Sequence, residues 1–331
     1  MSFKEIVGNE QVKQILKLSL SKDRLPNSLL FVGPAGVGKL KTALTVAKAL
    51  NCQEMRGDSC DHCDSCQKID RSQHPNVRII AREKGREQIV KEQIDEINYL
   101  ATLRPWNQGK VVFIIDEAER MNETVANSFL KTLEEPRFFA YFILITEDLQ
   151  AILPTIRSRC QVLKFKPLSQ EDVEKALVIQ GLSAEQARLM ATATDGNLEV
   201  ALELSWDEFI NVRNRAWLLF RQLLETVQAE DFLNLVAGRA RKDIMEEFKE
   251  MLLFFSVFFR DLLVLIEGKS DFLFNPDLRS ELESLSRQLP AERAARGVSL
   301  IEDFLGRLKK NPNLSIMSNE LVIFFRRIKD V

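Results

Sequence analysis

The chain has 331 residues, of which 28% are charged and 45% hydrophobic, and its formal net charge is −2. This length predicts two or three domains that each bury a core, and the charge excludes a strongly basic nucleic-acid-binding protein, although a local basic face stays open. The N-terminus "MSFKEIVGNEQ" has no apolar signal core, and the longest apolar stretch, at 251–259, is too short to span a bilayer. We therefore expect a cytoplasmic protein. Five cysteines in such a chain indicate metal binding or free thiols rather than disulfides.

Strand-like and helix-like segments alternate over the first half of the chain. Segments with helical spacing of apolar residues predict helices at 12–23, 39–51, 87–105 and 123–136. Short apolar runs rich in β-branched residues predict buried strands at 27–33, 76–82, 109–116, 140–148 and 160–168. This alternation predicts an α/β domain with a mainly parallel sheet that helices cover on both faces.

No further strands are expected after Pro167. Residues 169–205 read as three short helices, with Ser169 as a candidate N-cap, and longer helices follow from about Trp206. The most apolar of these, at 248–269, is expected in the core of a helical bundle. The pattern predicts three parts: an α/β domain at 1–166 with a cysteine-rich insertion at 52–66, a small helical domain at 167–206, and a larger helical domain at 207–331.

The stretch "FVGPAGVGKLKTAL" resembles a phosphate-binding loop between a strand and a helix. The G-x-x-x-x-G-K pattern comprises Gly33, Pro34, Ala35, Gly36, Val37, Gly38 and Lys39. Its glycines would turn backbone N–H groups towards an anion, and Lys39 would add a full positive charge. The alternative is a strand–turn–helix joint that binds no nucleotide.

The residue after the loop lysine normally offers a hydroxyl group to Mg²⁺, but Leu40 stands there. Thr42 is not a simple substitute, because two helical positions rotate a side chain by roughly 200°. Binding of ATP or ADP stays open on these grounds, whereas Mg²⁺ binding is doubtful.

Asp116 and Glu117 end the expected strand in "VVFIIDEAERM". They would lie at the carboxyl edge of the sheet, where ligands bind in open α/β folds. In a working ATPase, the aspartate orients Mg²⁺ and the glutamate positions the attacking water. The alternative is an acid pair that only favours a following helix N-terminus.

Four cysteines lie close together in the sequence with the spacing C-x7-C-x2-C-x2-C: Cys52, Cys60, Cys63 and Cys66. Paired thiolates at this spacing reach one tetrahedral ion, and four ligands close its coordination sphere. We expect a structural zinc ion, with an iron–sulfur cluster as a minor alternative. His62 and His74 are interpreted as surface or turn residues, because four cysteines leave no ligand position for them.

Arg159 precedes the last expected strand, in "LPTIRSRCQVLKF". On the residues alone, it is either a solvated surface charge or a group that binds phosphate.

Taken together, these motifs resemble those of the bacterial clamp-loader subunits of DNA polymerase III, which are AAA+ ATPases. The resemblance covers nearly the whole chain. It rests on "GNEQVKQIL", "RLPNSLLFVGPAGVGK", the cysteine motif, "HPNV", "FIIDEAERM", "LKTLEEP", "LPTIRSRCQ" and "NPNLSIMSNELVIFFRRI". It implies a nucleotide-binding-type domain, a small helical lid and a helical collar, which match the three expected parts.

The resemblance also implies roles for individual residues. Arg159 corresponds to an arginine finger that would act on ATP bound by an adjacent subunit, and the four cysteines match the zinc knuckle of the family. Leu40 departs from the family pattern, as does Glu199, which stands where motor subunits carry a phosphate-sensing arginine in the lid. We therefore expect a non-motor subunit with weak or absent ATPase activity and no polymerase activity of its own.

The partners implied by this resemblance are clamp-loader subunits of the gamma/tau and delta types, together with the β sliding clamp and primed DNA. No membrane partner is expected. Two alternatives stay open: a gamma/tau-type motor subunit that hydrolyses its own ATP, and a zinc-stabilised binding scaffold with a vestigial nucleotide fold.

Overall fold

The computed structural model describes residues 2–83, 86, 88–194, 196–225, 241–308 and 313–329. The described chain forms two compact units: one comprises residues 1–173 with 196–199, and the other comprises residues 174–195 with 200–331. The boundary between them falls inside the expected small helical domain. The division into three domains therefore stays a prediction.

The first unit is built on a parallel five-stranded sheet with the order β2-β3-β4-β1-β5. The strands are β1 (Ser28–Val32), β2 (Val77–Ile80), β3 (Val111–Ile115), β4 (Ala140–Thr146) and β5 (Gln161–Lys164). All five expected strands are confirmed. The three central strands are almost wholly buried, as continuous apolar runs in a parallel sheet require.

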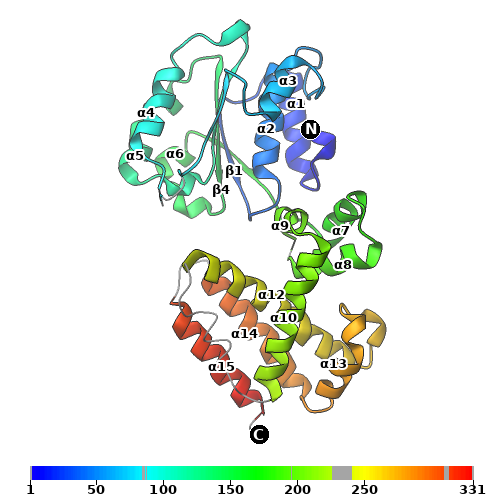
Figure 1. Ribbon diagram of the computed structural model, residues 1–331. Coiled ribbons are helices and arrows are strands. Elements are labelled where there is room, and N and C mark those ends of the chain that lie inside the picture. Colours follow the sequence, from blue (N-terminus) through cyan, green and yellow to red (C-terminus); the bar gives the residue numbers. More distant parts are fainter. Residues whose placement is uncertain are drawn as a thin grey trace. The chain divides into compact units, whose positions relative to one another are not determined.

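Helices cover both faces of this sheet (Figure 1). One face carries α1 (Glu10–Ser21), α2 (Lys39–Asn51) and α3 (Asp64–Asp70), and the other carries α4 (Lys91–Leu100), α5 (Glu123–Glu134) and α6 (Pro154–Arg157). Four short 3₁₀ segments complete the unit: η1 (Phe3–Glu5), η2 (Trp106–Gln108), η3 (Ala118–Arg120) and η4 (Leu149–Ala151). The α/β class expected from the alternation of elements is thus confirmed.

The core on the α4–α5 face explains why these segments form these elements. Phe129 of α5 packs edge-on against Phe142 of β4, whose ring stacks on Phe113 of β3. Ile94 and Ile97, one helical turn apart on α4, are buried in the same cluster. Buried aromatic rings from three elements therefore fix α5 against the centre of the sheet.

One expected helix was wrong in its extent. The helix expected over 87–105 is α4, which covers Lys91–Leu100 only. Ile89 instead pairs with Met121 as an isolated β-bridge, and Glu87 lies outside the described residues. At the other end, the backbone closes in tight turns, with N–H bonds from Thr102 to Tyr99 and from Leu103 to Leu100. The chain therefore leaves the helix well before Pro105, as residues near a proline tend to do.

The second unit is helical. Its longer helices are α8 (Ala184–Ala193), α10 (Trp206–Glu225), α12 (Arg241–Ile266), α13 (Arg279–Ser286), α14 (Ala291–Leu308) and α15 (Leu314–Lys329), with η5 (Ser270–Phe272) and η6 (Pro276–Leu278) between α12 and α13. The helices α7 (Gln170–Ile179) and α9 (Leu198–Glu203) each contribute to both units. Ser169 accepts a hydrogen bond from the Asp172 N–H at 3.1 Å, which confirms it as the N-cap of α7.

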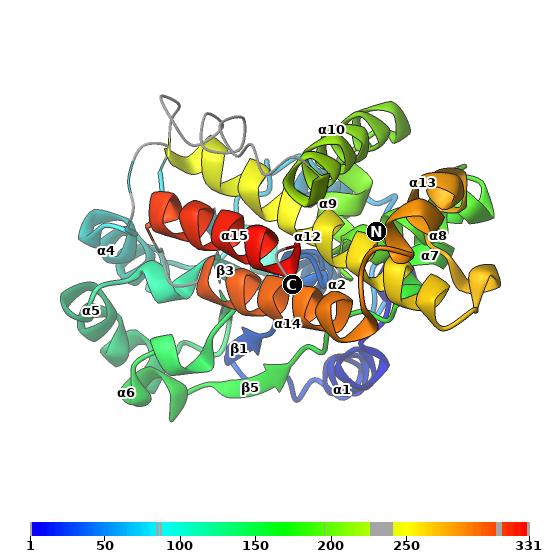
Figure 2. The same ribbon diagram turned by 90° about the horizontal axis from the view of Figure 1, so that it is seen from below.

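The apolar helix expected at 248–269 is the centre of this unit. Its residues 248–266 belong to α12, which ends three residues earlier than expected and packs against α10, α13 and α14 (Figure 2). Phe220 of α10 contacts the rings of Phe255 and Phe259 of α12 and of Phe325 of α15. The expected bundle core is therefore confirmed for the described helices. Residues 226–240, 309–312 and 330–331, which fall in the expected larger helical domain, lie outside the described residues.

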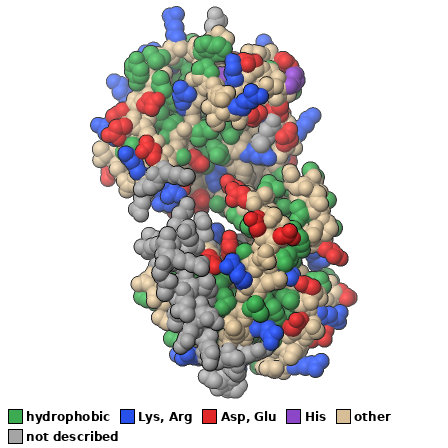
Figure 3. All heavy atoms as spheres, in the orientation of Figure 1, with side chains coloured by type: hydrophobic (Ala, Val, Ile, Leu, Met, Phe, Trp, Pro, Cys, Tyr) green, Lys and Arg blue, Asp and Glu red, His purple; other side chains and the backbone are tan. Residues whose placement is uncertain are grey.

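No described helix has both the length and the apolar character needed to cross a bilayer. On the face of the α/β unit shown in Figure 3, basic and acidic side chains are interspersed. This distribution agrees with the net charge of −2.

Candidate functional site

The phosphate-loop residues form the connection between β1 and α2. Gly36 and Gly38 have positive φ angles of 70° and 84°, which side chains rarely adopt. Gly33 lies against the backbone of Phe165, because a Cβ atom there would be 2.5 Å from the Phe165 carbonyl oxygen. The glycines expected from the motif are therefore required by the loop geometry itself.

Lys39 is buried at the first position of α2, and its ammonium group binds the loop. Its Nζ donates hydrogen bonds to the carbonyl oxygens of Gly33 at 2.6 Å and Pro34 at 2.5 Å. Burial lowers the pKa of Lys39, while the nearby carboxylates of Glu147 and Asp116 act in the opposite direction. The lysine expected to bind phosphate thus has two of its three hydrogens engaged by its own loop.

No hydroxyl group of the loop is free to approach a metal ion in the usual place. Leu40 is the second residue of α2. The hydroxyl of Thr42 is committed to the helix, because it donates to the carbonyl oxygen of Gly38 at 2.7 Å. This geometry supports the expectation that Thr42 does not replace the missing hydroxyl.

Asp116 and Glu117 follow β3 at the carboxyl edge of the sheet, as expected. Burial, together with the neighbouring charge of Glu117, raises the pKa of Asp116. Glu117 has a φ angle of 50° and accepts a hydrogen bond from Arg82 Nε at 2.6 Å. Arg82, just beyond β2, was not among the expected site residues. It neutralises the carboxylate that an ATPase would use to position water.

Two residues of the expected lid lie close to the loop. Asn197 lies directly against Gly36, since a Cβ atom on Gly36 would fall 1.7 Å from the Asn197 Oδ1. Burial lowers the pKa of Lys39, and the negative charge of Glu199 partly offsets this effect. The charge of Glu199 therefore acts on the loop lysine, while its role in the lid stays a prediction. Asn197 and Glu147 are site residues that the sequence analysis missed.

The four expected zinc ligands come together in one group. The Sγ atoms of Cys52, Cys60, Cys63 and Cys66 all lie within 4.8 Å of one another, and none of them forms a disulfide. Cys52 follows the end of α2, while Cys63 caps the start of α3 and Cys66 lies within it. This donor set fits a four-coordinate structural zinc ion.

Backbone N–H groups donate hydrogen bonds to two of these sulfur atoms. The N–H of Met55 donates to Cys52 Sγ and that of Cys63 to Cys60 Sγ, both at 3.3 Å. Burial acts to raise the pKa of Cys63, but backbone hydrogen bonds from Gln53 and Cys66 outweigh it and lower this pKa to about 7. Burial instead raises the pKa of Cys60 and of Cys66, so a bound metal ion would be needed to hold these two as thiolates.

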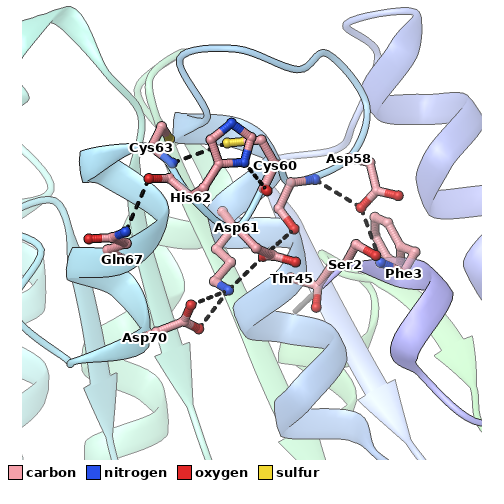
Figure 4. Close-up of polar contacts among 12 residues, drawn as sticks. Ser2, Phe3, Thr45, Asp58, Cys60, Asp61, His62, Cys63, Gln67 and Asp70 are labelled. Carbon is pink, nitrogen blue, oxygen red and sulfur yellow. Dashed lines mark hydrogen bonds and ion pairs between the residues drawn. The ribbon is translucent and has the colours of Figure 1, made fainter.

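The cysteine knuckle, residues 52–70, is anchored to the rest of the unit by Lys48 and by Asp58, which Figure 4 shows beside Phe3. Lys48 of α2 is buried, and its Nζ donates to Asp61 at 2.9 Å and to Asp70 at 2.6 Å. Asp58 accepts from the backbone N–H of Phe3 at 3.1 Å. Burial of the ammonium group acts to lower the pKa of Lys48, but the hydrogen bonds to Asp70 and Asp61 outweigh burial and raise this pKa. Contacts at both ends therefore hold the knuckle in place.

The two histidines differ from each other. His62 is exposed, as expected, and pairs with Glu54 and with the Cys60 carbonyl, which raises its pKa. His74 is buried and so is not a surface residue, but it does begin a turn, because its carbonyl oxygen accepts from the Val77 N–H at 3.2 Å. Its Nδ1 accepts from the Asn76 N–H at 3.2 Å, which leaves Nε2 to donate to Ser65 Oγ at 3.0 Å. It thus joins the end of the knuckle to the start of β2.

Arg159 lies just after α6, and its side chain turns back over that helix. Its Nη1 donates to the Thr155 carbonyl oxygen at 2.8 Å and to Ser158 Oγ at 3.3 Å. Its Nη2 forms an ion pair with Glu134, the last residue of α5. The side chain is 31% exposed. Arg159 therefore lies at the rim of the unit rather than in its core, as expected, but it is paired within its own chain.

The parallel sheet, the glycine-rich loop before α2 and the acid pair after β3 define the first unit as an α/β domain of the phosphate-loop type, and a helical region follows it. Two family models match: "DNA polymerase III, delta subunit" over residues 8–169, and its C-terminal counterpart over residues 213–324. The chain is 32% identical to the DNA polymerase III subunit delta′ of Bacillus subtilis over 98% of this chain and 99% of that protein. It therefore belongs to the delta′ subunit family of the DNA polymerase III clamp loader.

Other similar proteins share part of this relationship. The DNA polymerase III subunit tau of Escherichia coli is 32% identical over 62% of this chain, but the match covers only 32% of that protein. Among solved structures, a gamma-subunit-related protein of Thermotoga maritima is 18% identical, with a TM-score of 0.46 over 97% of this chain and 99% of that one.

Proposed function

We propose that this chain is a non-motor subunit of the clamp loader that helps to place the β sliding clamp on primed DNA. The observation that carries the proposal is the contrast between two sites in one unit. The phosphate loop has Leu40 in place of the Mg²⁺ hydroxyl, and its lysine is bonded to loop carbonyls. Arg159, by contrast, is partly exposed at the rim. The chain would hydrolyse little or no ATP itself and carries no polymerase activity.

Arg159 would act in trans as an arginine finger on ATP held by an adjacent subunit. A guanidinium is planar and permanently charged, which suits it to bind phosphate oxygens. In related phosphoryl-transfer systems, a finger of this kind contributes about 10³–10⁵ in rate. In this account Gly33–Lys39, Asp116 and Glu117 keep the shape of a nucleotide site, and any ATP or ADP bound there would depend little on Mg²⁺.

The four cysteines would hold one structural zinc ion, in line with the closed ligand set described above. The partners would be subunits of the gamma/tau and delta types in a hetero-oligomer, with the β sliding clamp and primed DNA bound by the whole complex. We place this activity in the cytoplasm. The lid (167–206) and the collar (207–331) would serve nucleotide-dependent movement and assembly, respectively.

The proposal is tested by reconstituting the clamp loader from gamma/tau-type and delta-type subunits with wild-type chain or with Arg159→Ala. Arg157→Ala is the matched control, because Arg157 is two residues away and bonds to Gln150 instead. Arg159→Ala should assemble normally but load clamps poorly, whereas Arg157→Ala should behave like the wild type. Equal clamp loading by all three complexes would rule out the finger role. A chain that loads no clamp in any form would support the scaffold alternative.

A further inference from the structure

Arg159 has an unusual partner in Glu134, whose position is locally unfavourable. Glu134 is the last residue of α5, and Glu135 follows it as the C-cap. The C-terminal end of a helix carries partial negative charge, so that two acidic residues there are destabilising unless a cation compensates. Lys131 lies in the same last turn, and Arg159 adds a second cation through its Nη2. The acidic residues at the end of α5 thus depart from the usual preference for basic residues at a helix C-terminus, and they do so where Arg159 binds.

The hydrogen bonds of the guanidinium describe a folded-back conformation. A guanidinium has five N–H donors. Here Nη1 bonds to Thr155 and Ser158 of its own segment, and Nη2 bonds to Glu134. Nε is buried and has no hydrogen-bond partner among the described residues. A buried donor without a partner makes a conformation less favourable. The folded-back conformation of the Arg159 side chain is therefore less stable than one in which every N–H has an acceptor.

We infer that Glu134 is a positioning residue, which holds the Arg159 guanidinium folded against α6 and α5 until a neighbouring phosphate competes for it. This inference rests on the proposed role of Arg159 as a finger in trans. The carboxylate neutralises the guanidinium through one nitrogen in the resting chain, whereas a phosphate group can accept two parallel hydrogen bonds from it and carries more charge. Engagement of phosphate would also give Nε–H the acceptor that it lacks.

The first test needs no ATPase activity. Arg159 in the isolated chain is modified with a 1,2-dicarbonyl reagent, and the rate is followed by peptide mass spectrometry. In Glu134→Gln, which keeps the shape but removes the charge, modification of Arg159 should be about two- to fivefold faster, the range that a partly exposed ion pair supports. The matched control is Glu135→Gln, since Glu135 has no described contact with Arg159. Unchanged reactivity in Glu134→Gln, or an equal change in Glu135→Gln, would overturn the inference.

The second test measures the effect of Glu134 on ATP turnover by the assembled complex. Without clamp and DNA, the reconstituted complex carrying Glu134→Gln should turn over ATP about two- to fivefold faster than the wild type. In an Arg159→Ala background, the same substitution should have no effect, because a residue that acts only through Arg159 has nothing left to hold. An equal increase in both backgrounds, or no increase in either, would contradict the inference.

The two tests separate failure of the inference from failure of the proposed function. If Arg159→Ala lowers clamp-stimulated turnover while Glu134→Gln changes neither reactivity nor resting turnover, the finger role stands and the role of Glu134 is overturned. If Arg159→Ala leaves stimulated turnover unchanged, the finger role fails, and the role of Glu134 in the reaction fails with it. Thermal unfolding of each variant shows whether the fold is retained.

Discussion

Thr42 donates its hydroxyl hydrogen to the carbonyl oxygen of Gly38, 2.7 Å away, and so leaves the phosphate loop without a hydroxyl for Mg²⁺. Leu40, the residue in the usual Mg²⁺ position, has none to offer. The isolated chain should therefore show negligible ATP turnover, and any nucleotide binding should be nearly the same with Mg²⁺ and with EDTA.

A single replacement should not restore activity. Leu40→Thr supplies the missing hydroxyl, but Glu199 stays near Lys39, and Arg82 still pairs with Glu117. The variant should thus hydrolyse ATP no faster than the wild type in a coupled phosphate-release assay. Turnover in Leu40→Thr that Lys39→Met abolishes would show that the missing hydroxyl alone silences the site.

The cysteine group should hold one zinc ion per chain, as measured by elemental analysis of the purified protein. Cys63→Ser should lose the metal and expose residues 52–70 to amide hydrogen exchange, because binding of a structural metal is coupled to local folding. Cys160→Ser is the control, since Cys160 lies outside the group. Native protein without zinc, or full zinc content in Cys63→Ser, would contradict this prediction.

Lys48 should be the main anchor of the knuckle on α2. Lys48→Met removes a buried ammonium from Asp61 and Asp70, and because both carboxylates are partly exposed, we expect a loss of about 1–3 kcal/mol in the free energy of unfolding. Lys68→Met, which breaks an exposed pair with Asp64 one turn apart, should cost no more than about 0.5 kcal/mol. Urea denaturation of the zinc-loaded proteins measures both.

The pH dependence of this anchor has a definite sign. Although burial opposes it, bonding to Asp70 and Asp61 raises the pKa of Lys48 above its ordinary value. The contribution from protonation of Lys48 is therefore complete below that ordinary value and is lost only as the pH rises through the higher folded-state pKa. The difference between wild type and Lys48→Met should stay constant across neutral pH and shrink in strongly alkaline solution. It should also shrink in acid, because bonding to Lys48 helps to lower the pKa of Asp61.

Two glycines of α14 should respond to alanine with opposite signs. A Cβ atom on Gly297 would lie 2.6 Å from the ring of Phe259 in α12, so Gly297→Ala should destabilise the helical unit by about 1–3 kcal/mol. A Cβ atom on Gly306 meets nothing within 4 Å, and Gly306→Ala should stabilise by up to about 1 kcal/mol through helix propensity. Thermal unfolding of both variants tests the close packing of α12 on α14.

Much of the fold could be predicted because its signals are local. The buried strands are continuous apolar runs, and the helices around them have regular apolar spacing. The seven-residue helix α3 was missed because it is too short to show such spacing and lies among the cysteines. The end of α4 at Leu100 was missed because nothing in the sequence before Pro105 marks it.

The site was predicted less completely because several of its contacts depend on tertiary structure. The phosphate loop and the four cysteines are short motifs whose spacing carries the chemistry. Arg82, beyond the end of β2, pairs with Glu117, beyond the end of β3, and Glu134 meets Arg159 from 25 residues away. No local pattern predicts such pairs, nor the burial of His74.

The central claim is that this chain contributes to ATP hydrolysis in trans and not at its own phosphate loop. It is tested most directly by the ATP turnover of the reconstituted clamp loader at saturating clamp and primed DNA, with Lys39→Met or Arg159→Ala in this subunit alone. Lys39→Met should leave turnover unchanged, because its own site is not used, whereas Arg159→Ala should lower it by the share of one ATP site. A loss with Lys39→Met and none with Arg159→Ala would contradict the account and identify the chain as a motor subunit.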